Sequence, residues 1–169
     1  MDRRGGEYRL TLSAGLPARE VTALRAIAKY LRQAGFAFSQ AYMEEALARN
    51  ADIAGKIAEL FTHRFDPALD AEARRHACET LNARIDAALG DVSSLDEDRI
   101  LRRFRNAVMS CLRTTYFQTQ ADGAPKPVLA FKFDSQALDD LPAPRPLYEI
   151  FVFSPRLEGV HLRFGKVAR

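Results

Sequence analysis

Two candidate strands and the turn between them lie in LYEIFVFSPRLEGVHLRF, residues 147–164. Residues 147–153 are apolar at nearly every position, which predicts a strand covered on both faces. Residues 154–156, Ser-Pro-Arg, predict a turn. From Val160 to Phe164 apolar residues then occur at every second position, as they do in a strand with one apolar face.

A third strand is expected upstream, where Leu129, Phe131 and Phe133 alternate with small or polar residues. A proline-rich connection, residues 141–146, leads from it to the pair described above. A short alternating stretch at residues 8–13 predicts one more strand near the N-terminus. About three strands therefore occupy the C-terminal part of the chain.

Five amphipathic helices are expected before these strands, because apolar residues recur there at three- and four-residue spacing. Pro17 at a first helical position, Ser39 as an N-cap and Gly35 as a left-handed C-cap mark helix ends. Pro67 should end the third helix, because proline disfavours helix in the residue before it. The expected ranges are 17–35, 39–50, 53–65, 70–89 and 94–112.

The fifth helix carries the clearest signal. Residues 94–97, Ser-Leu-Asp-Glu, form a capping box in which the Ser94 hydroxyl accepts from the Glu97 amide and the Glu97 carboxylate reaches back to the Ser94 amide. Its apolar stripe repeats over about four turns and includes Cys111 and Leu112. We therefore expect an α+β fold with a strand or linker at residues 1–16, a helical domain at 17–117 and a β-rich segment at 118–169.

Composition is that of an ordinary globular protein. The 169 residues are 47% apolar and 28% charged, with a net charge of +3, which gives little reason to expect a nucleic-acid partner. No apolar run approaches the roughly 20 residues of a membrane span, and no secretory signal is visible, so we expect a cytoplasmic location. Cys78 and Cys111 are expected to be reduced core thiols, and the three histidines show no metal-ligand spacing.

Four arginines lie off the apolar stripe of the fifth helix and could contact phosphates, although a solvated or salt-bridged face accounts for them better. They are Arg99, Arg102, Arg103 and Arg113. The adjacent acids at 44–45 and at 139–140 are better read as surface charge than as catalytic pairs, because neighbouring side chains point apart. No glycine-rich phosphate loop and no recognisable nucleophile occurs in the sequence.

The basic end of the last strand is the best candidate site. Arg163, Lys166 and Arg169 follow one another at three-residue spacing around Gly165, at a strand end where binding groups are commonly mounted. A solvated C-terminus would look the same. The neighbouring His161 is more typical of a structural histidine than of a catalytic base, although its charge can change near neutral pH.

Seven segments, spread in order over the chain from about residue 10, resemble the large multidomain bacterial NAD-specific glutamate dehydrogenases. The segments are residues 30–33, 39–42, 64–67, 94–103, 131–133, 149–152 and 154–163. The resemblance implies helices that connect N-terminal regulatory domains to a catalytic part, followed by the first strands of a glutamate-binding domain. The sequence differs from the family's usual sequence at residues 16–18, and Met1 stands where the family's sequence is already in mid-protein. We therefore expect a fragment, either an isolated segment or the product of a broken gene.

The resemblance also implies the chemistry. The whole enzyme would oxidise L-glutamate to 2-oxoglutarate and ammonia while reducing NAD, and it would form a homo-oligomer. Arg169 stands where smaller dehydrogenases of this chemistry have a lysine that contacts a substrate carboxylate, with Lys166 and Arg163 as weaker candidates. The catalytic lysine and the Rossmann domain would follow residue 169, so this chain alone should bind no NAD and be inactive, with the remainder of the catalytic domain as its partner.

Two other functions stay open from the sequence. One is a stand-alone helical regulatory or protein-interaction module without catalysis. The other is nucleic-acid binding through the arginine-bearing helix, which would show strong salt dependence. If the chain is a fragment, its strands should be the region least protected from amide exchange, and slow exchange throughout residues 129–164 would count against that expectation.

Overall fold

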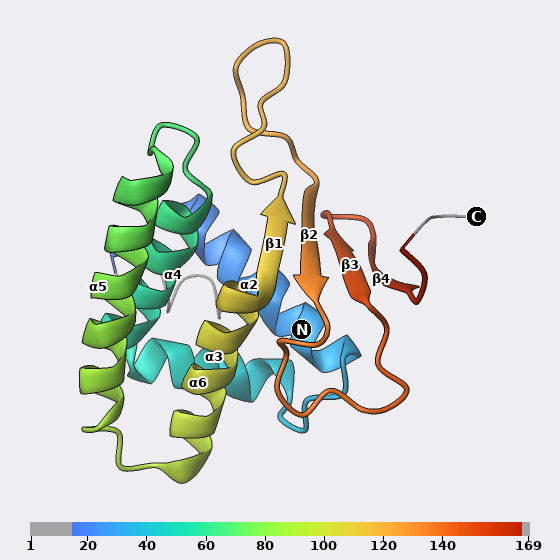
Figure 1. The fold of residues 1–169 in the computed structure, drawn as a ribbon. Coiled ribbons are helices and arrows are strands. Elements are labelled where there is room, and N and C mark those ends of the chain that lie inside the picture. Colours follow the sequence, from blue (N-terminus) through green and yellow to red (C-terminus); the bar gives the residue numbers. More distant parts are fainter. Residues whose placement is uncertain (1–14, 167–169) are drawn as a thin grey trace.

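The computed structural model describes residues 15–166, in which helices precede an antiparallel sheet (Figure 1). The helices are α2 (Ala18–Gln33), α3 (Gln40–Arg49), α4 (Ala51–Phe65), α5 (Ala71–Leu89) and α6 (Leu95–Ser110). The strands are β1 (Cys111–Thr114), β2 (Leu129–Asp134), β3 (Tyr148–Phe153) and β4 (Glu158–Arg163), and they lie side by side in chain order. The expected α+β class is confirmed, while the strand expected at residues 8–13 lies outside the described residues.

Local residue chemistry explains several helix ends. Ser39 Oγ accepts from the Tyr42 amide at 3.2 Å, and Ser94 Oγ accepts from the Glu97 amide at 3.3 Å. Gly35 follows α2 with φ of +92°, the left-handed conformation that glycine tolerates best. Pro17 was expected at the first helical position, but it is the N-cap of α2, and the helix begins one residue later, at Ala18. The reason is that the ψ of Pro17, 142°, is not helical.

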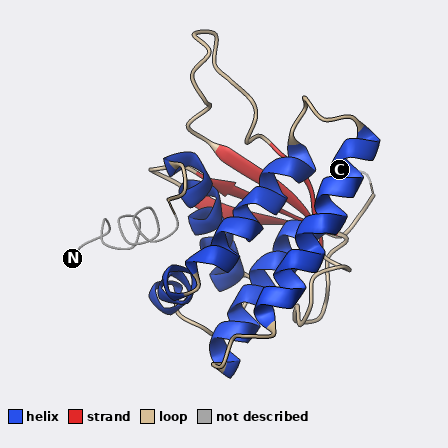
Figure 2. Cartoon of the chain, turned by 90° about the vertical axis from the view of Figure 1, so that its left-hand side faces the viewer, coloured by secondary structure: helices blue, strands red, loops and turns tan. Residues whose placement is uncertain are grey.

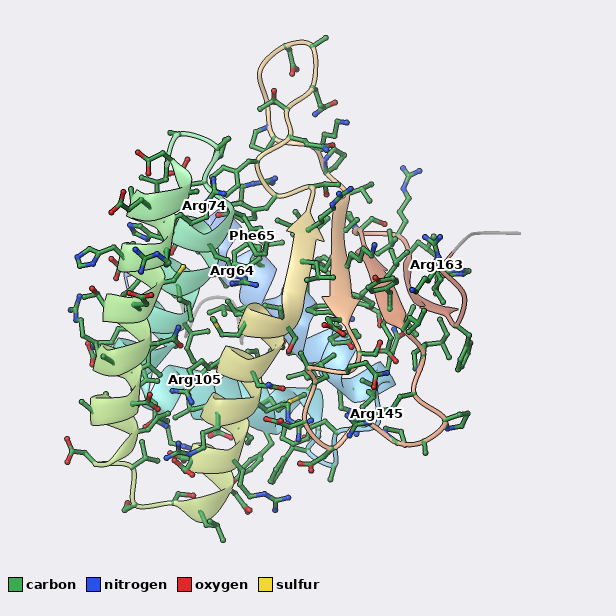
Figure 3. All side chains as sticks on the ribbon, viewed as in Figure 1. Arg64, Phe65, Arg74, Arg105, Arg145 and Arg163 are labelled. Carbon is green, nitrogen blue, oxygen red and sulfur yellow. The ribbon has the colours of Figure 1, made fainter. Side chains whose placement is uncertain are left out.

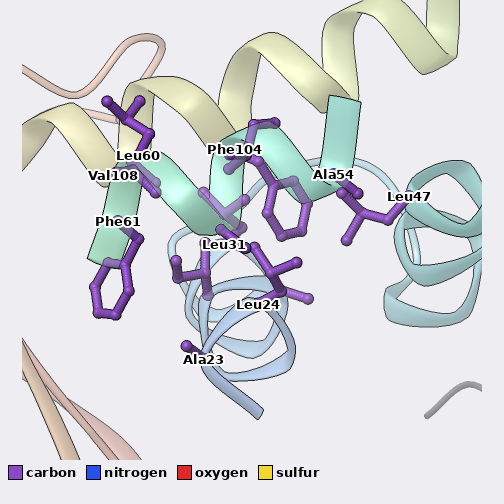
Figure 4. Close-up of a cluster of buried hydrophobic side chains, with 14 of the residues drawn as sticks. Ala23, Leu24, Leu31, Leu47, Ala54, Leu60, Phe61, Phe104 and Val108 are labelled. Carbon is purple, nitrogen blue, oxygen red and sulfur yellow. The ribbon is translucent and has the colours of Figure 1, made fainter. Parts of the chain in front are cut away.

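The helices cover one face of the sheet, as the side view shows (Figure 2). Tyr30 of α2 stacks on Phe133 of β2 with ring centroids 4.1 Å apart, and Phe61 of α4 lies 5.9 Å from Phe131. Phe104 of α6 is fully buried among the helices (Figure 4). A single buried apolar cluster therefore runs from the helices into the sheet.

The fifth helix ends earlier than its periodicity predicts. Cys111 and Leu112 were expected on its apolar stripe, but Cys111 begins β1 and pairs with Phe133, which gives four strands rather than about three. The guanidinium of Arg64 donates to the carbonyls of Met109 and Cys111 at 2.9 and 3.2 Å, and so satisfies backbone acceptors where α6 stops. Cys111 is buried in either conformation, so its apolar character could not distinguish helix from strand.

Half of the expected capping box is also wrong. The carboxylate of Glu97 accepts from Arg49 Nε and Asn50 Nδ2, both at 2.7 Å. Glu97 therefore ties the start of α6 to the junction of α3 and α4, where Asn50 lies, instead of closing its own helix start.

The expectation that β3 is covered on both faces is wrong within the described residues. Glu149 and Phe151 are buried against the helices, but Tyr148, Ile150 and Val152 on the opposite face are only half-buried. The apolar side of β4 lies at the margin of the core, where Leu162 remains 47% exposed. The sheet thus has one buried face and one open face.

Candidate functional site

Strand register gathers cations on the open face of the sheet. Arg113 of β1 lies opposite Lys132 of β2, Lys132 opposite Ile150 of β3, and Ile150 opposite His161 of β4. Directly opposed residues of antiparallel strands project to the same face, so these side chains form one row across the sheet. A second row holds Asp134, Tyr148 and Arg163. We call these two rows the open sheet face.

Lys132 lies near the middle of the open sheet face. Its Nζ is 3.9 Å from the centroid of the Tyr148 ring, a cation–π contact that positions the ammonium without neutralising it. Arg113 is exposed and has no ion pair or hydrogen-bonded side-chain partner within residues 15–166. Asp134 is the acid of these two rows. The face therefore suits a group that carries carboxylates.

Arg163 fixes the backbone that follows β4. Its Nε donates to the Gly165 carbonyl at 3.1 Å, and its Nη2 donates to the Lys166 carbonyl at 2.7 Å (Figure 3 labels Arg163). The Leu147 amide donates to the Arg163 carbonyl at 2.8 Å, which joins the ends of β3 and β4. Arg163 thus holds the turn that presents Lys166.

The three residues predicted as substrate ligands are only partly described. Arg163 and Lys166 are brought together through the turn, and the Lys166 side chain is exposed. Arg169 lies outside the described residues, so its role stays a prediction. His161, for which a structural role was favoured, is exposed on the open sheet face and has no hydrogen bond or ion pair within residues 15–166.

A buried acid anchors β3 beneath this face. Glu149, 5% exposed, accepts a hydrogen bond from the Tyr30 hydroxyl. Burial and that hydrogen bond to a carboxylate raise the pKa of Tyr30 above its ordinary value, so the phenol stays neutral. Because Tyr30 also stacks on Phe133, this contact connects α2 with both β2 and β3.

The arginines expected on α6 do not form a common phosphate-binding face. Arg102 pairs with Asp98 at 2.9 Å and Arg103 with Asp140 at 2.6 Å, which confirms the salt-bridged interpretation for both. Arg113 is on β1 and not on the helix. Arg99 lies over the ring of Phe38.

Other sequence-based expectations can be compared directly. Cys78 and Cys111 are buried and free, and burial raises the pKa of both thiols, that of Cys111 to about 12. Within residues 15–166, no cluster of three or more potential metal ligands occurs. The helices of the same range fall short of the length and apolarity that a bilayer crossing requires.

Lys132, Arg113 and Tyr148 were not identified as site residues from the sequence. The alternation of β2 was a usable signal for Lys132, because it places that residue on the side opposite Phe131 and Phe133. No comparable local signal existed for Arg113, which the periodicity assigned to a helix.

Two family comparisons divide the chain near α5. Residues 8–67 match the family described as glutamate dehydrogenase, helical motif 3. Residues 84–169, about half of the chain, match the family described as bacterial NAD-glutamate dehydrogenase, catalytic domain. The chain belongs to the bacterial NAD-glutamate dehydrogenase family.

Curated relatives agree with this assignment. The chain is 47% identical over 161 residues to the NAD-specific glutamate dehydrogenase of Mycobacterium tuberculosis. It is also 47% identical over 163 residues to that of Pseudomonas aeruginosa, and 46% identical over 162 residues to that of Halomonas elongata. Each alignment covers 95% of this chain and 10% of the relative. The chain therefore spans about a tenth of the length of these glutamate dehydrogenases.

Proposed function

We propose that this chain is the segment of an NAD-dependent glutamate dehydrogenase that joins the helical motif to the first strands of the glutamate-binding domain. The reaction of the whole protein would convert L-glutamate, NAD and water into 2-oxoglutarate, ammonia and NADH. The observation that carries the proposal is the open sheet face, where Lys132, Arg113 and Arg163 lie on one side of a sheet that belongs to the matched catalytic region.

Substrate binding is assigned to the basic end of β4. Arg169 would pair with a substrate carboxylate, because a guanidinium offers two parallel donors to one carboxylate. Lys166 would add a second positive charge from the same turn. Arg163 has a positioning role in this proposal, supported by its hydrogen bonds to the carbonyls of Gly165 and Lys166.

We infer that NAD binds outside the described residues. Dinucleotides bind at a parallel strand–turn–helix unit with a glycine-rich turn, whereas the four strands of residues 111–163 pair antiparallel in chain order. We therefore assign NAD binding and the catalytic lysine to the remainder of the catalytic domain, which would cover the open sheet face. The isolated chain would then be inactive, and the assembled enzyme would be a cytoplasmic homo-oligomer.

The division into a helical domain at 17–117 and a β-rich segment at 118–169 stays a prediction. The buried cluster that contains Tyr30, Phe61 and Phe131 spans both parts, which supports folding of the two as a unit. A stand-alone interaction module remains the alternative outcome of the experiment below.

A chimera tests the proposal. Residues 1–169 would replace the matching segment of the Mycobacterium tuberculosis relative, and NADH formation from glutamate would be followed by absorbance. We expect Arg169→Ala to raise the KM for glutamate by about tenfold or more, since charge-assisted bidentate contacts have that strength. Arg156→Ala is the matched control, because Arg156 is an exposed arginine on the turn between β3 and β4.

Arg163→Ala separates positioning from direct contact. It should raise the KM and also loosen the turn, seen as lower NMR backbone order parameters at Gly165 and Lys166, without any loss of NAD binding. An active chimera whose KM for glutamate is the same in the Arg169, Arg163 and Arg156 variants would contradict the site assignment. A folded chimera without glutamate-dependent activity would favour the interaction module.

A further inference from the structure

An irregularity in the pairing of β1 with β2 decides which side chains meet on the open sheet face. Cys111 lies opposite Phe133, and the register then shifts, so that Arg113 rather than Leu112 lies opposite Lys132. A β-bulge of this kind changes the face to which a side chain points. The Cys111 thiol donates to the Arg113 carbonyl at 3.3 Å across the irregular step. The irregularity therefore puts two cations side by side.

Arg113 and Lys132 form a like-charge pair without a counterion in the part of the chain that the structure describes. Like charges directly opposite on two strands are destabilising, because their Cβ atoms lie about 5 Å apart. The acid nearest in register is Asp134, but its Oδ1 accepts from the Gln136 amide at 3.0 Å. The Tyr148 ring, 3.9 Å from Lys132 Nζ, keeps the ammonium on this face. A carboxylate beside the pair would relieve the repulsion.

Apolar side chains adjoin this pair on the same face. Ile150 lies opposite Lys132, and Ala130 and Val152 lie opposite each other in the neighbouring row. All three are half-buried, so part of each side chain is still in contact with water. The described helices lie on the other face of the sheet and do not cover them (Figure 2). The face thus combines a cationic pair with an apolar strip.

We propose that Arg113 and Lys132 together bind one carboxylate of an amphipathic segment that lies across the open sheet face with its apolar side on Ile150 and Val152. We call this the covering segment. The guanidinium offers two parallel donors to the carboxylate, and the ammonium adds a third contact. A free substrate carboxylate would leave the apolar strip in water, whereas a segment of polypeptide removes it from water as well.

The covering segment is assigned to the catalytic part outside residues 1–169, so this inference rests on the proposed function. Residues 84–169, which contain the whole sheet, match the catalytic domain, and the chain spans about a tenth of the length of the curated relatives. Charge complementarity supports an acidic occupant, because Arg113, Lys132 and Arg163 face a single acid, Asp134, on the two rows.

The test is cross-linking of the Mycobacterium tuberculosis chimera with a carbodiimide, which joins an amine directly to a carboxylate that touches it. Peptide mass spectrometry identifies the acid joined to Lys132. We expect an Asp or Glu outside residues 1–169, in a peptide with apolar residues nearby. No cross-link at Lys132, or a cross-link to Asp134 alone, would overturn the proposal.

Variants separate this contact from the rest of the molecule. Arg113→Gln should lower the yield of the Lys132 cross-link by about threefold or more, since it removes one of the two cations that hold the carboxylate. Arg156→Gln is the control, because Arg156 is an exposed arginine on the turn between β3 and β4. Equal yields in the two variants would contradict the site.

The isolated 169-residue chain gives the opposite expectation. There Arg113→Gln should leave the urea midpoint of unfolding unchanged or raise it, because it removes repulsion without removing a partner. A lower midpoint would mean that Arg113 already has a stabilising partner within the chain, against the proposal. A folded chimera that forms no NADH would count against the proposed function alone, because the cross-link reports contact and not catalysis.

Discussion

Replacing Tyr30 by phenylalanine removes one hydroxyl from the interior and leaves the buried Glu149 carboxylate without that donor. The stacking of the ring on Phe133 at 4.1 Å is retained in the variant, so the change isolates the hydrogen bond. Hydrogen bonds to charged groups contribute about 1.5–3 kcal/mol, and Glu149 is 5% exposed, so water cannot readily replace the lost donor. We expect Tyr30→Phe to lower the free energy of unfolding by about 2 kcal/mol.

Urea unfolding of the isolated chain measures this loss. For a chain of this size an m-value near 2 kcal/mol per molar implies a fall in the midpoint of about 1 M. Tyr42→Phe is the matched control, since the Tyr42 ring stacks on Phe38 but its hydroxyl makes no hydrogen bond within residues 15–166. The control should change the free energy by less than about 0.5 kcal/mol.

The pH dependence gives a second measure of the same contact. The folded-state pKa of Tyr30 is raised by burial and by Glu149, so the unfolded chain ionises first, near its ordinary pKa of 10. This contribution is therefore fully present below pH 10 and is lost above it, by about 1.4 kcal/mol per pH unit for one proton. Tyr30→Phe should flatten this alkaline limb. A loss below about 0.5 kcal/mol in the variant, or an unchanged limb, would refute the buried contact.

Three further predictions concern other parts of the molecule. An alkylating reagent at pH 8 should label Cys78, which is 8% exposed, before Cys111, which is 1% exposed. Burial also raises the pKa of the Cys111 thiol to about 12, so little of it is reactive thiolate at pH 8. Peptide mass spectrometry measures both labelling rates, and equal rates would argue against the burial described. Hydrogen bonds, chiefly from Asn50, lower the pKa of Glu97, so its contribution to stability is present above about pH 4.5 and lost as the pH falls. Glu97→Gln should therefore reduce the loss of unfolding free energy between neutral and acid pH. An unchanged dependence on acid pH would contradict the contact. Acetylation of Lys132 should be fast in the isolated chain and slow in the chimera, because the remainder of the catalytic domain would cover the open sheet face; equal rates would contradict that covering.

Helix positions were predictable because the information is local. The hydroxyls of Ser39 and Ser94 accept amide hydrogen bonds three residues ahead, and a serine before an apolar repeat is visible in any single sequence. Gly35 and Pro67 were equally readable as helix ends. The resemblance to the family was correct for the same reason, since it rested on contiguous segments.

The start of β1 was not predictable from local pattern. Cys111 satisfies the helical period, whereas β1 lacks a regular alternation because its register shifts between Cys111 and Arg113. The choice of strand depends on pairing with Phe133 and on capping by Arg64. Both partners are distant in sequence. The same limit applies to Glu97, whose carboxylate bonds to Asn50 on the preceding helix junction rather than to its own helix.

The candidate site was predictable only in part. The basic spacing that ends in Arg169 could be read directly, and the structure accounts for Arg163 as the residue that holds the turn. The open sheet face required strand order and register, which no alternation in a single strand supplies. Lys132 and Arg113 meet there because β1 and β2 pair.

Glutamate-dependent reduction of NAD by the unaltered chimera tests the central claim most directly. If residues 1–169 are a working segment of an NAD-dependent glutamate dehydrogenase, the chimera should retain kcat/KM for glutamate within about tenfold of the Mycobacterium tuberculosis relative, a change of about 1.4 kcal/mol. The isolated chain should form no NADH under the same conditions. A chimera that is folded and binds NAD, but does not oxidise glutamate, would contradict the claim.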